Sequence, residues 1–182
     1  TVSATANAEA TVYGKIHTSV ASISQDDGTT SSSATAISSH ASRLGIKAKK
    51  GLANGMEISA KAEFEMDAVS GSYSKSKDYD LDFDNDGTDD ATVTDKDNYI
   101  FKARNVYVGL KGNFGEVRVG RHDTPHKLAT SKLDPFGDTY ADYNNIIQND
   151  NRVGNVLAYL NKFGPVGIAA AYAAGDDSVT GE

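Results

Sequence analysis

The segment Met56–Met66 constrains the fold more than any other stretch of the chain. Every second residue from Met56 onward is alanine or a larger apolar residue, and the residues between them are glutamate, serine or lysine. A period of two places successive side chains on opposite faces of a β-strand. The segment also reaches the ~9–11 residues that a tilted membrane-crossing strand needs, whereas a globular strand usually has about 5–6. It therefore predicts a long, two-faced strand and favours one that crosses a membrane.

Alternation of the same kind recurs along the chain and predicts an all-β fold. We expect seven strands, at Glu9–Ile23, Ser39–Lys49, Met56–Met66, Asn98–Lys111, Glu116–Arg121, Asn151–Asn161 and Val166–Ala174. The alternation is imperfect in the fourth strand, because Arg104 shares its parity with Val106. Either a bulge shifts the register there, or small apolar residues face the polar side.

The predicted connections between the strands alternate in length. Short turns are expected at 50–55, 112–115 and 161–165, and long polar loops at 24–38, 68–98 and 122–150. In an up-and-down meander, this alternation places all short turns at one end of the sheet and all long loops at the other. Short turns on one side and long loops on the other are typical of outer-membrane barrels.

Composition excludes several classes of protein. Hydrophobic residues make up 38% of the chain, and no apolar run approaches the ~20 residues of a membrane helix, so a helical membrane protein is excluded. A transmembrane barrel is not, since its strands alternate and its average hydropathy stays low. The absence of cysteine excludes a disulfide framework, and the net charge of -7 argues against a nucleic-acid partner.

The N-terminus resembles the end of an export signal. Ala6-Asn7-Ala8 is a small-x-small triplet of the kind that precedes a cleavage site. We therefore expect residues 1–8 to be the remnant of a signal peptide and the mature chain to begin near Glu9. An unstructured N-terminal tail is the alternative.

The stretch from Arg121 to Arg152 has no strand pattern. It contains two prolines, a central Pro-Phe-Gly-Asp-Thr at 135–139, clustered acids and several aromatic residues. Long loops in compact domains are usually functional or disordered, and the aromatic residues give this one something to pack with. It is therefore predicted to be an ordered, functional loop.

Several segments, taken in order, resemble the general diffusion porins of Gram-negative outer membranes. They are Ala10–Lys15 (ATVYGK), Ser42–Lys47 (SRLGIK), Arg104–Gly112 (RNVYVGLKG), Gly115–Arg121 (GEVRVGR), Pro135–Thr139 (PFGDT) and Asn151–Tyr159 (NRVGNVLAY). None of these motifs is specific alone, but their order and spacing together are, from Glu9 to about Gly175.

The resemblance implies a fold, a location and an activity. The fold is an antiparallel up-and-down transmembrane β-barrel, which in this family has about 16 strands around an aqueous channel. With seven strands, residues 9–182 are expected to be the N-terminal part of such a barrel. The implied activity is passive diffusion of ions and small hydrophilic solutes across the outer membrane. The implied partners are membrane lipid, lipopolysaccharide and two further copies in a homotrimer, with neither enzymatic activity nor an obligatory cofactor.

The resemblance also implies that the third long loop folds into the barrel and narrows it, with basic wall residues facing loop acids. The matching basic positions are Lys15, Arg43, Arg104 and Arg152, with Lys102 and Arg121 as weaker matches, and the matching acids are Asp134 and Asp138. Our specific expectation is that Asp134 and Asp138 face Arg43 and Arg104 across the pore. The alternative is a set of ordinary surface salt bridges, each worth ~0–1 kcal/mol.

A second polar loop carries a calcium-like pattern. Its acids are Asp82, Asp84, Asp86 and Asp90, with Gly87 among them, but Val93 stands where a calcium loop has its closing glutamate. The alternatives are a solvated acidic loop and a contact with a neighbouring subunit. If these acids do bind Ca²⁺, the runner-up function is a secreted β-rich adhesion or structural domain. A barrel enzyme is a weaker third possibility, because His122 and His126 lie close together in the sequence but no nucleophile is evident beside them.

Overall fold

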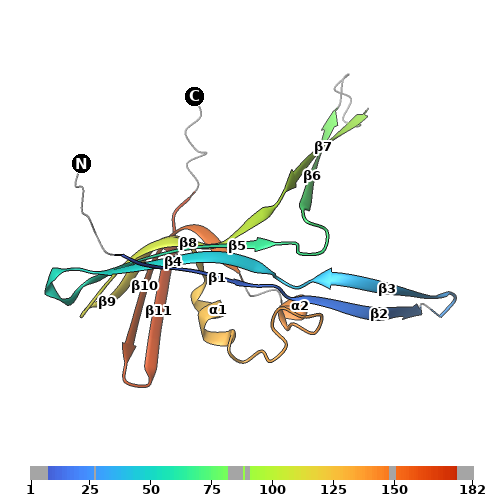
Figure 1. Cartoon of the computed structure of the whole chain (residues 1–182). Helices are drawn as coiled ribbons and strands as arrows, with labels where there is room; N and C mark the ends of the chain where they lie inside the picture. Colours follow the sequence, from blue (N-terminus) through green and yellow to red (C-terminus); the bar gives the residue numbers. More distant parts are fainter. Residues whose placement is uncertain (1–7, 27, 82–87, 89–90, 148–150, 176–182) are drawn as a thin grey trace. The chain divides into compact units, whose positions relative to one another are not determined.

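The computed structural model of the chain describes residues 8–26, 28–81, 88, 91–147 and 151–175. These residues form eleven strands, two short α-helices and one turn of 3-10 helix (Figure 1). The strands are β1 (Glu9–Lys15), β2 (Thr18–Asp26), β3 (Ser31–Ser39), β4 (Arg43–Gly51), β5 (Glu57–Met66), β6 (Tyr73–Leu81), β7 (Ala91–Tyr99), β8 (Phe101–Gly112), β9 (Gly115–Asp123), β10 (Arg152–Phe163) and β11 (Val166–Ala173). The helices are η1 (Ala53–Gly55), α1 (Pro125–Thr130) and α2 (Asn144–Ile147).

The chain divides into two compact units, which are described separately. The first comprises the residues up to Lys15, Arg43–Glu65, and those from Ala103 onward. The second comprises Ile16–Ser42 and Met66–Lys102. The first unit contains the main sheet and both α-helices, and the second contains two separate hairpins.

The first unit is built on one seven-stranded sheet with the order β1-β4-β5-β8-β9-β10-β11. Neighbouring strands run antiparallel wherever their register is defined. Each strand therefore pairs with the next one along the chain that belongs to this sheet, as a meander requires. The prediction of a seven-stranded antiparallel sheet is confirmed.

For two of the three predicted long loops, the predicted local structure is wrong, because strands lie where irregular loops were expected. Residues 24–38 and 68–98 form most of the β2–β3 and β6–β7 hairpins, and the predicted strand Glu9–Ile23 is divided between β1 and β2. These hairpins are rich in serine, threonine and charged residues, so they lack the apolar alternation that marks a strand in sequence. Their backbone groups pair nonetheless, because the ladder needs no apolar side chains.

One face of the main sheet is apolar and open. Directly opposed residues share a face in an antiparallel ladder. One such row runs across four strands through Val108, Val119, Leu157 and Tyr172. These side chains are 51–69% exposed. The described chain therefore does not cover this face itself, as expected of a surface that meets an apolar medium or another apolar surface.

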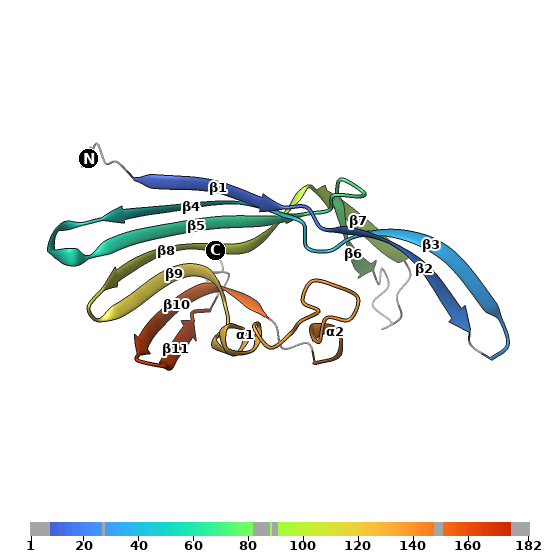
Figure 2. The same ribbon diagram turned by 60° about the horizontal axis from the view of Figure 1, so that its bottom comes forward.

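The other face of the sheet is polar and carries the helices. Figure 2 shows α1 and α2 on the concave side of the curved sheet.

In the described residues, the buried hydrophobic side chains are Val156 and Ala158, both on β10. Neither α-helix in the described ranges has the length or apolar composition to span a membrane. Burial of apolar groups inside this chain thus contributes little to the fold.

Strand alternation is interrupted at two places. In β10, Val153 pairs with His122 and Val156 with Gly120, so two residues stand opposite Arg121 as a bulge. In β8, the adjacent residues Arg104 and Asn105 are both buried. This second irregularity lies in the predicted strand Asn98–Lys111, where the alternation of the sequence did not decide which residues face the polar side.

Gly120 provides a test of the close approach between β8 and β9. It has a φ of 133°, and a Cβ there would lie 2.3 Å from the carbonyl oxygen of Val106. Gly120→Ala should therefore lower the free energy of unfolding by on the order of 2 kcal/mol, since backbone cannot move aside cheaply. The measurement is urea unfolding of the full-length protein in lipid. Gly167→Ala is the matched control, because a Cβ there meets no atom within 4 Å. Equal midpoints for the two variants would contradict the packing.

Candidate functional site

The connection between β9 and β10 begins with a capped helix. Thr124 precedes α1, its side-chain oxygen accepts a hydrogen bond from Lys127 N at 3.3 Å, and Pro125 occupies the first turn. A hydroxyl cap followed by proline is a strong start signal for a helix, because the hydroxyl satisfies a free N–H group and proline needs none. The helix therefore sets the direction in which the loop leaves the sheet.

Acidic side chains shape the rest of this loop from within. Asp134 accepts hydrogen bonds from the backbone N–H groups of Phe136 (2.8 Å) and Tyr143 (3.2 Å). Asp142 accepts from the N–H groups of Asp138 and Asn144, both at 2.8 Å. Carboxylates that accept from backbone donors close tight turns. Asp134 is thus engaged with its own loop.

Asp138 is the acid that joins the loop to the sheet. Its Oδ2 lies 2.5 Å from Arg43 Nη2 and 3.6 Å from Lys15 Nζ. Lys15 and Arg43 are directly opposed residues of β1 and β4, so their side chains share the polar face. A charge-assisted hydrogen bond of this length is among the stronger polar contacts. The pair holds the loop against the first two strands of the sheet.

The surroundings of Asp138 favour its charged form. Partial burial by itself would raise the pKa of this carboxyl group. The attraction of Arg43 and Arg104, together with the hydrogen bond from Arg43, outweighs that effect and lowers the pKa below its usual range. The loop carboxylate is therefore ionised throughout the neutral and mildly acidic range.

Arg104 is held by the sheet and not by the loop. Only 5% of its surface is exposed, and its Nε and Nη1 lie 2.9 Å from Glu63 and 2.5 Å from Glu65, respectively. Glu65 in turn stands directly opposite Arg43. Removing one member of such a buried pair leaves an uncompensated charge and typically costs 3–5 kcal/mol. Arg104 therefore ties β8 to β5 beneath the loop.

A glycine makes room for the aromatic part of this network. The ring of Tyr13 covers Gly45, its partner on β4, so closely that a Cβ at Gly45 would lie 2.4 Å from a ring atom. The Tyr13 hydroxyl donates a hydrogen bond to Glu63 at 2.7 Å, and Lys61 Nζ lies 3.1 Å from the same carboxylate. An aromatic ring laid over a cross-strand glycine restores packing where the glycine has no side chain.

A second ionic cluster stabilises the place where the loop joins the ends of β9 and β10. Arg152 Nε lies 2.9 Å from Asp123 Oδ1, and Asn105 donates a hydrogen bond to Asp123 Oδ2 at 2.6 Å. Lys127 of α1 lies 3.8 Å from the same carboxylate. Asp123 thus joins the two strands that flank the loop to β8 and to the first helix of the loop.

Most of the residues predicted for the site line one cavity of about 230 Å³. Its lining consists of Arg43, Arg104, Lys127, Ser131, Asp134, Gly137, Asp138, Asp142, Tyr143 and Arg152. Lys15 joins the set through its contact with Asp138. Of the expected facing residues, Asp138 does contact Arg43, and also Lys15, whereas Arg104 contacts two glutamates. Asp134 accepts hydrogen bonds from its own loop. The weaker matches lie elsewhere: Lys102 belongs to the second unit, and Arg121 stands opposite Val106.

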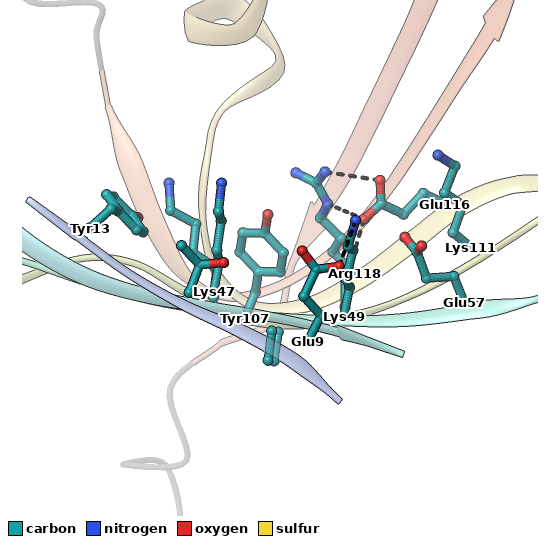
Figure 3. A pocket seen from close by; sticks show the side chains of 14 residues that line it. Glu9, Tyr13, Lys47, Lys49, Glu57, Tyr107, Lys111, Glu116 and Arg118 are labelled. Carbon is teal, nitrogen blue, oxygen red and sulfur yellow. Dashed lines mark hydrogen bonds and ion pairs between the residues drawn. The ribbon is translucent and has the colours of Figure 1, made fainter. Parts of the chain in front are cut away.

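The polar face continues beyond the loop as a charged hollow of about 560 Å³ (Figure 3). Its labelled side chains stand on one side of the strands, and Glu116 is joined to Arg118 at 2.8 Å. Lys47 and Lys61 are directly opposed on β4 and β5, with both Nζ atoms within 6 Å of the centre of the Tyr13 ring. The aromatic face partly offsets the repulsion of these like charges. This stretch is suited to contact with water and ions.

Sequence reasoning missed Glu63, Glu65, Asp123 and Lys127 as members of the ionic network. The positions of the two glutamates could have indicated this role, because both lie on the polar face of the predicted strand Met56–Met66. Asp123 and Lys127 had none beyond their charge. The calcium pattern at Asp82, Asp84, Asp86 and Asp90 lies outside the described residues. The described part holds no group of three or more histidine, cysteine, aspartate or glutamate residues placed to bind a metal.

The lowered pKa of Asp138 has a consequence for stability. A depressed folded-state pKa means that the contribution is complete above the unfolded value of about 3.9 and is lost as the pH falls through the lower, folded value. The difference in free energy of unfolding between wild type and Asp138→Asn should therefore be constant from about pH 7 to 5 and shrink below about pH 4. Paired urea titrations across this range provide the measurement. A difference that shrinks between pH 7 and 5 would contradict the assignment.

Comparison with known proteins agrees with this geometry. A search of curated proteins finds no match. Among solved structures, the chain is similar to an anion-selective porin from Comamonas acidovorans, with a TM-score of 0.64 and 24% sequence identity. The alignment covers 92% of this chain and 47% of that protein, so the chain spans about half the length of its structural neighbour. The family described as Gram-negative porin matches residues 1–182. The chain therefore belongs to the Gram-negative porin family, and its open sheet is part of a porin β-barrel.

Proposed function

We propose that the whole protein forms a water-filled channel in an outer membrane, through which ions and small hydrophilic solutes diffuse passively. The loop between β9 and β10 narrows this channel. The observation that carries the proposal is the contact of Asp138 with Arg43 and Lys15, because it holds the loop on the polar face of the sheet. A loop held there occupies space that the barrel would otherwise leave to water.

The two faces of the sheet support the membrane part of the proposal. A row of exposed apolar side chains suits contact with lipid, whereas the opposite face carries ion pairs that suit water. Each edge of the sheet, β1 and β11, has one neighbour among the described strands. A barrel abolishes such edges by closure, which here requires further strands of the whole protein.

The charges of the site explain how the constriction would act on solutes. The loop contributes carboxylates and the wall contributes guanidinium and ammonium groups to the same cavity. Opposed charges across a narrow aqueous gap create a transverse field that orients dipolar solutes, and charged linings set the barrier for ions. The buried pairs of Arg104 keep this field fixed, because its side chain is held at two points. Passage needs no reaction, so we propose no enzymatic activity.

The proposed surroundings follow from the same role. We propose that the protein resides in the outer membrane in contact with lipid and lipopolysaccharide, and that it assembles as a homotrimer. Export through a signal peptide ending near Ala8 belongs to the same proposal. These points rest on membership of the porin family.

Neutralising the loop acid tests the constriction. Asp138→Asn removes a negative charge while Lys15 and Arg43 keep theirs, so anions should become more favoured. We expect the anion-to-cation permeability ratio to rise about twofold, equivalent to about 0.4 kcal/mol. Reversal potentials of the full-length protein in planar bilayers under a salt gradient provide the measurement.

The control for this experiment is Asp97→Asn, which removes the same charge from the exposed side of a hairpin in the second unit. It should leave the permeability ratio unchanged. If the folded Asp138→Asn variant behaved like this control, the loop would not line the channel. If the inserted wild-type protein gave no conductance at all, the channel itself would be ruled out.

A further inference from the structure

One histidine of the main sheet is enclosed near the end of β9, where the strand leads into the loop. His122 is 3% exposed, and it shares the polar face of β9 with Glu116 and Arg118, because the three residues stand at every second position. The ring of Tyr107 on β8 packs against its imidazole in a T-shaped arrangement, with ring centroids 5.2 Å apart. The contacts of Asp138 described above do not include this histidine.

Two hydrogen bonds define the protonation state of His122. Its Nε2 lies 2.6 Å from Nη1 of Arg118, and a guanidinium nitrogen can only donate, so Nε2 accepts and carries no hydrogen. Its Nδ1 lies 2.7 Å from the carbonyl oxygen of Asp123, which can only accept, so Nδ1 carries the hydrogen. His122 is therefore held as the neutral Nδ1–H tautomer.

The bond to His122 completes a set of contacts that fix the guanidinium of Arg118. Nε and Nη2 of Arg118 donate to the two carboxylate oxygens of Glu116 at 2.8 and 2.9 Å, which leaves Nη1 for His122. Cζ of Arg118 lies 4.6 Å from the centre of the Tyr107 ring. Glu116 is itself held, because Ser59 of β5 donates to it at 3.2 Å. A planar guanidinium bonded along several edges cannot turn freely, so its charge stays in one place.

The position of this charge matters for the channel. Arg118 lines the charged hollow of about 560 Å³, where it stands beside Tyr107 and Glu116 (Figure 3). Charged groups in the lining of a pore set the electrostatic barrier that a permeating ion meets. A residue that holds Arg118 on its carboxylate partner therefore acts on permeation without touching the solute.

A second proton on His122 would be taken up at the Arg118 contact. The charged and titratable groups that lie on or next to the contacts of His122 are Glu116, Arg118 and Asp123 of β9, Tyr107 of β8, Arg152 of β10 and Lys127 of α1. The last two lie 2.9 and 3.8 Å from the carboxylate of Asp123. Arg118 is the group bonded to the ring nitrogen without hydrogen, so protonation turns this hydrogen bond into a contact between two donors.

We propose that His122 is a positioning residue that sets the ion selectivity of the channel through Arg118, an inference that rests on the channel function proposed above. The neutral ring keeps the guanidinium on Glu116, which balances its charge. Histidine is the side chain that gains a charge most readily on mild acidification. The protonated ring releases Nη1 of Arg118 and adds a second cation to the polar face. The wall then favours anions more strongly.

Reversal potentials of the full-length protein in planar bilayers, recorded at about pH 7.5 and about pH 4.5, test this role. Acidification should raise the anion-to-cation permeability ratio about twofold more in wild type than in His122→Gln, because glutamine accepts from Arg118 but takes up no proton. His126→Gln is the matched control, because His126 is an exposed histidine of α1, and it should keep the wild-type response.

A third variant separates positioning from charge. His122→Leu offers no acceptor to Arg118, so its permeability ratio at neutral pH should differ from that of His122→Gln, although both side chains are uncharged. Equal ratios in these two variants would show that His122 does not act through Arg118. Equal pH responses of wild type and His122→Gln would also overturn the proposal, while the channel itself would stand. A wild type without conductance would remove the channel and this role together.

A further measurement does not depend on conductance. Nitrogen NMR of the histidine-labelled full-length protein in detergent micelles should show the His122 ring as the neutral Nδ1–H tautomer at neutral pH, identified by its loss in His122→Gln. This tautomer is the expected one because Arg118 and the carbonyl of Asp123 select it. A wild-type spectrum without any ring in this tautomer would contradict the contact, even if the variant failed to fold.

Discussion

Successive side chains of a β-strand point to opposite faces, and the first unit of this protein depends on that constraint. Seven strands in register turn the alternation of the sequence into one apolar surface and one charged surface. Within its described ranges, the chain buries almost none of its apolar side chains by itself. The sheet is therefore stabilised by its backbone ladder, by ion pairs on one face and, in the proposed setting, by lipid on the other.

The charged face solves a second physical problem. A half-buried charge is costly unless it is paired. On the polar face, Arg104 pairs with two glutamates of the neighbouring strand β5, and Arg118 pairs with Glu116 of its own strand. The contact of Asp138 differs from these pairs, because this acid comes from the loop to meet Arg43 and Lys15 of the sheet. The clusters around Arg104 and Asp123 hold the strands and the loop root on which that contact depends. The proposed constriction thus results from a rigid wall and one acid brought to it.

The sequence predicted the main sheet well because regular alternation is a direct consequence of strand geometry, as in Met56–Met66. It failed at the β2–β3 and β6–β7 hairpins, whose Ser, Thr and charged residues carry no periodic apolar signal. At the site, the resemblance to porins predicted most of the residues that line the cavity and the proximity of Asp138 to Arg43, but not the partners of Arg104 and Asp134. The partners of Arg104 depend on the local irregularity of β8, and those of Asp123 on the helix at 125–130. The irregularity of β8 cannot be obtained from residue types alone. Thr124 followed by Pro125 does indicate the start of a helix, but it does not indicate which carboxylate Lys127 will meet.

The central claim is that the loop carrying Asp138 lies in the path of the solutes. Gly137 adjoins this acid, is exposed and lines the cavity, and the chain contains no cysteine. A Gly137→Cys variant of the full-length protein, with any cysteine outside these 182 residues replaced, can therefore be modified at this position by a bulky, negatively charged thiol reagent during recording from single channels. The account predicts a stepwise fall in unit conductance as each copy reacts. Complete labelling with unchanged conductance would contradict it.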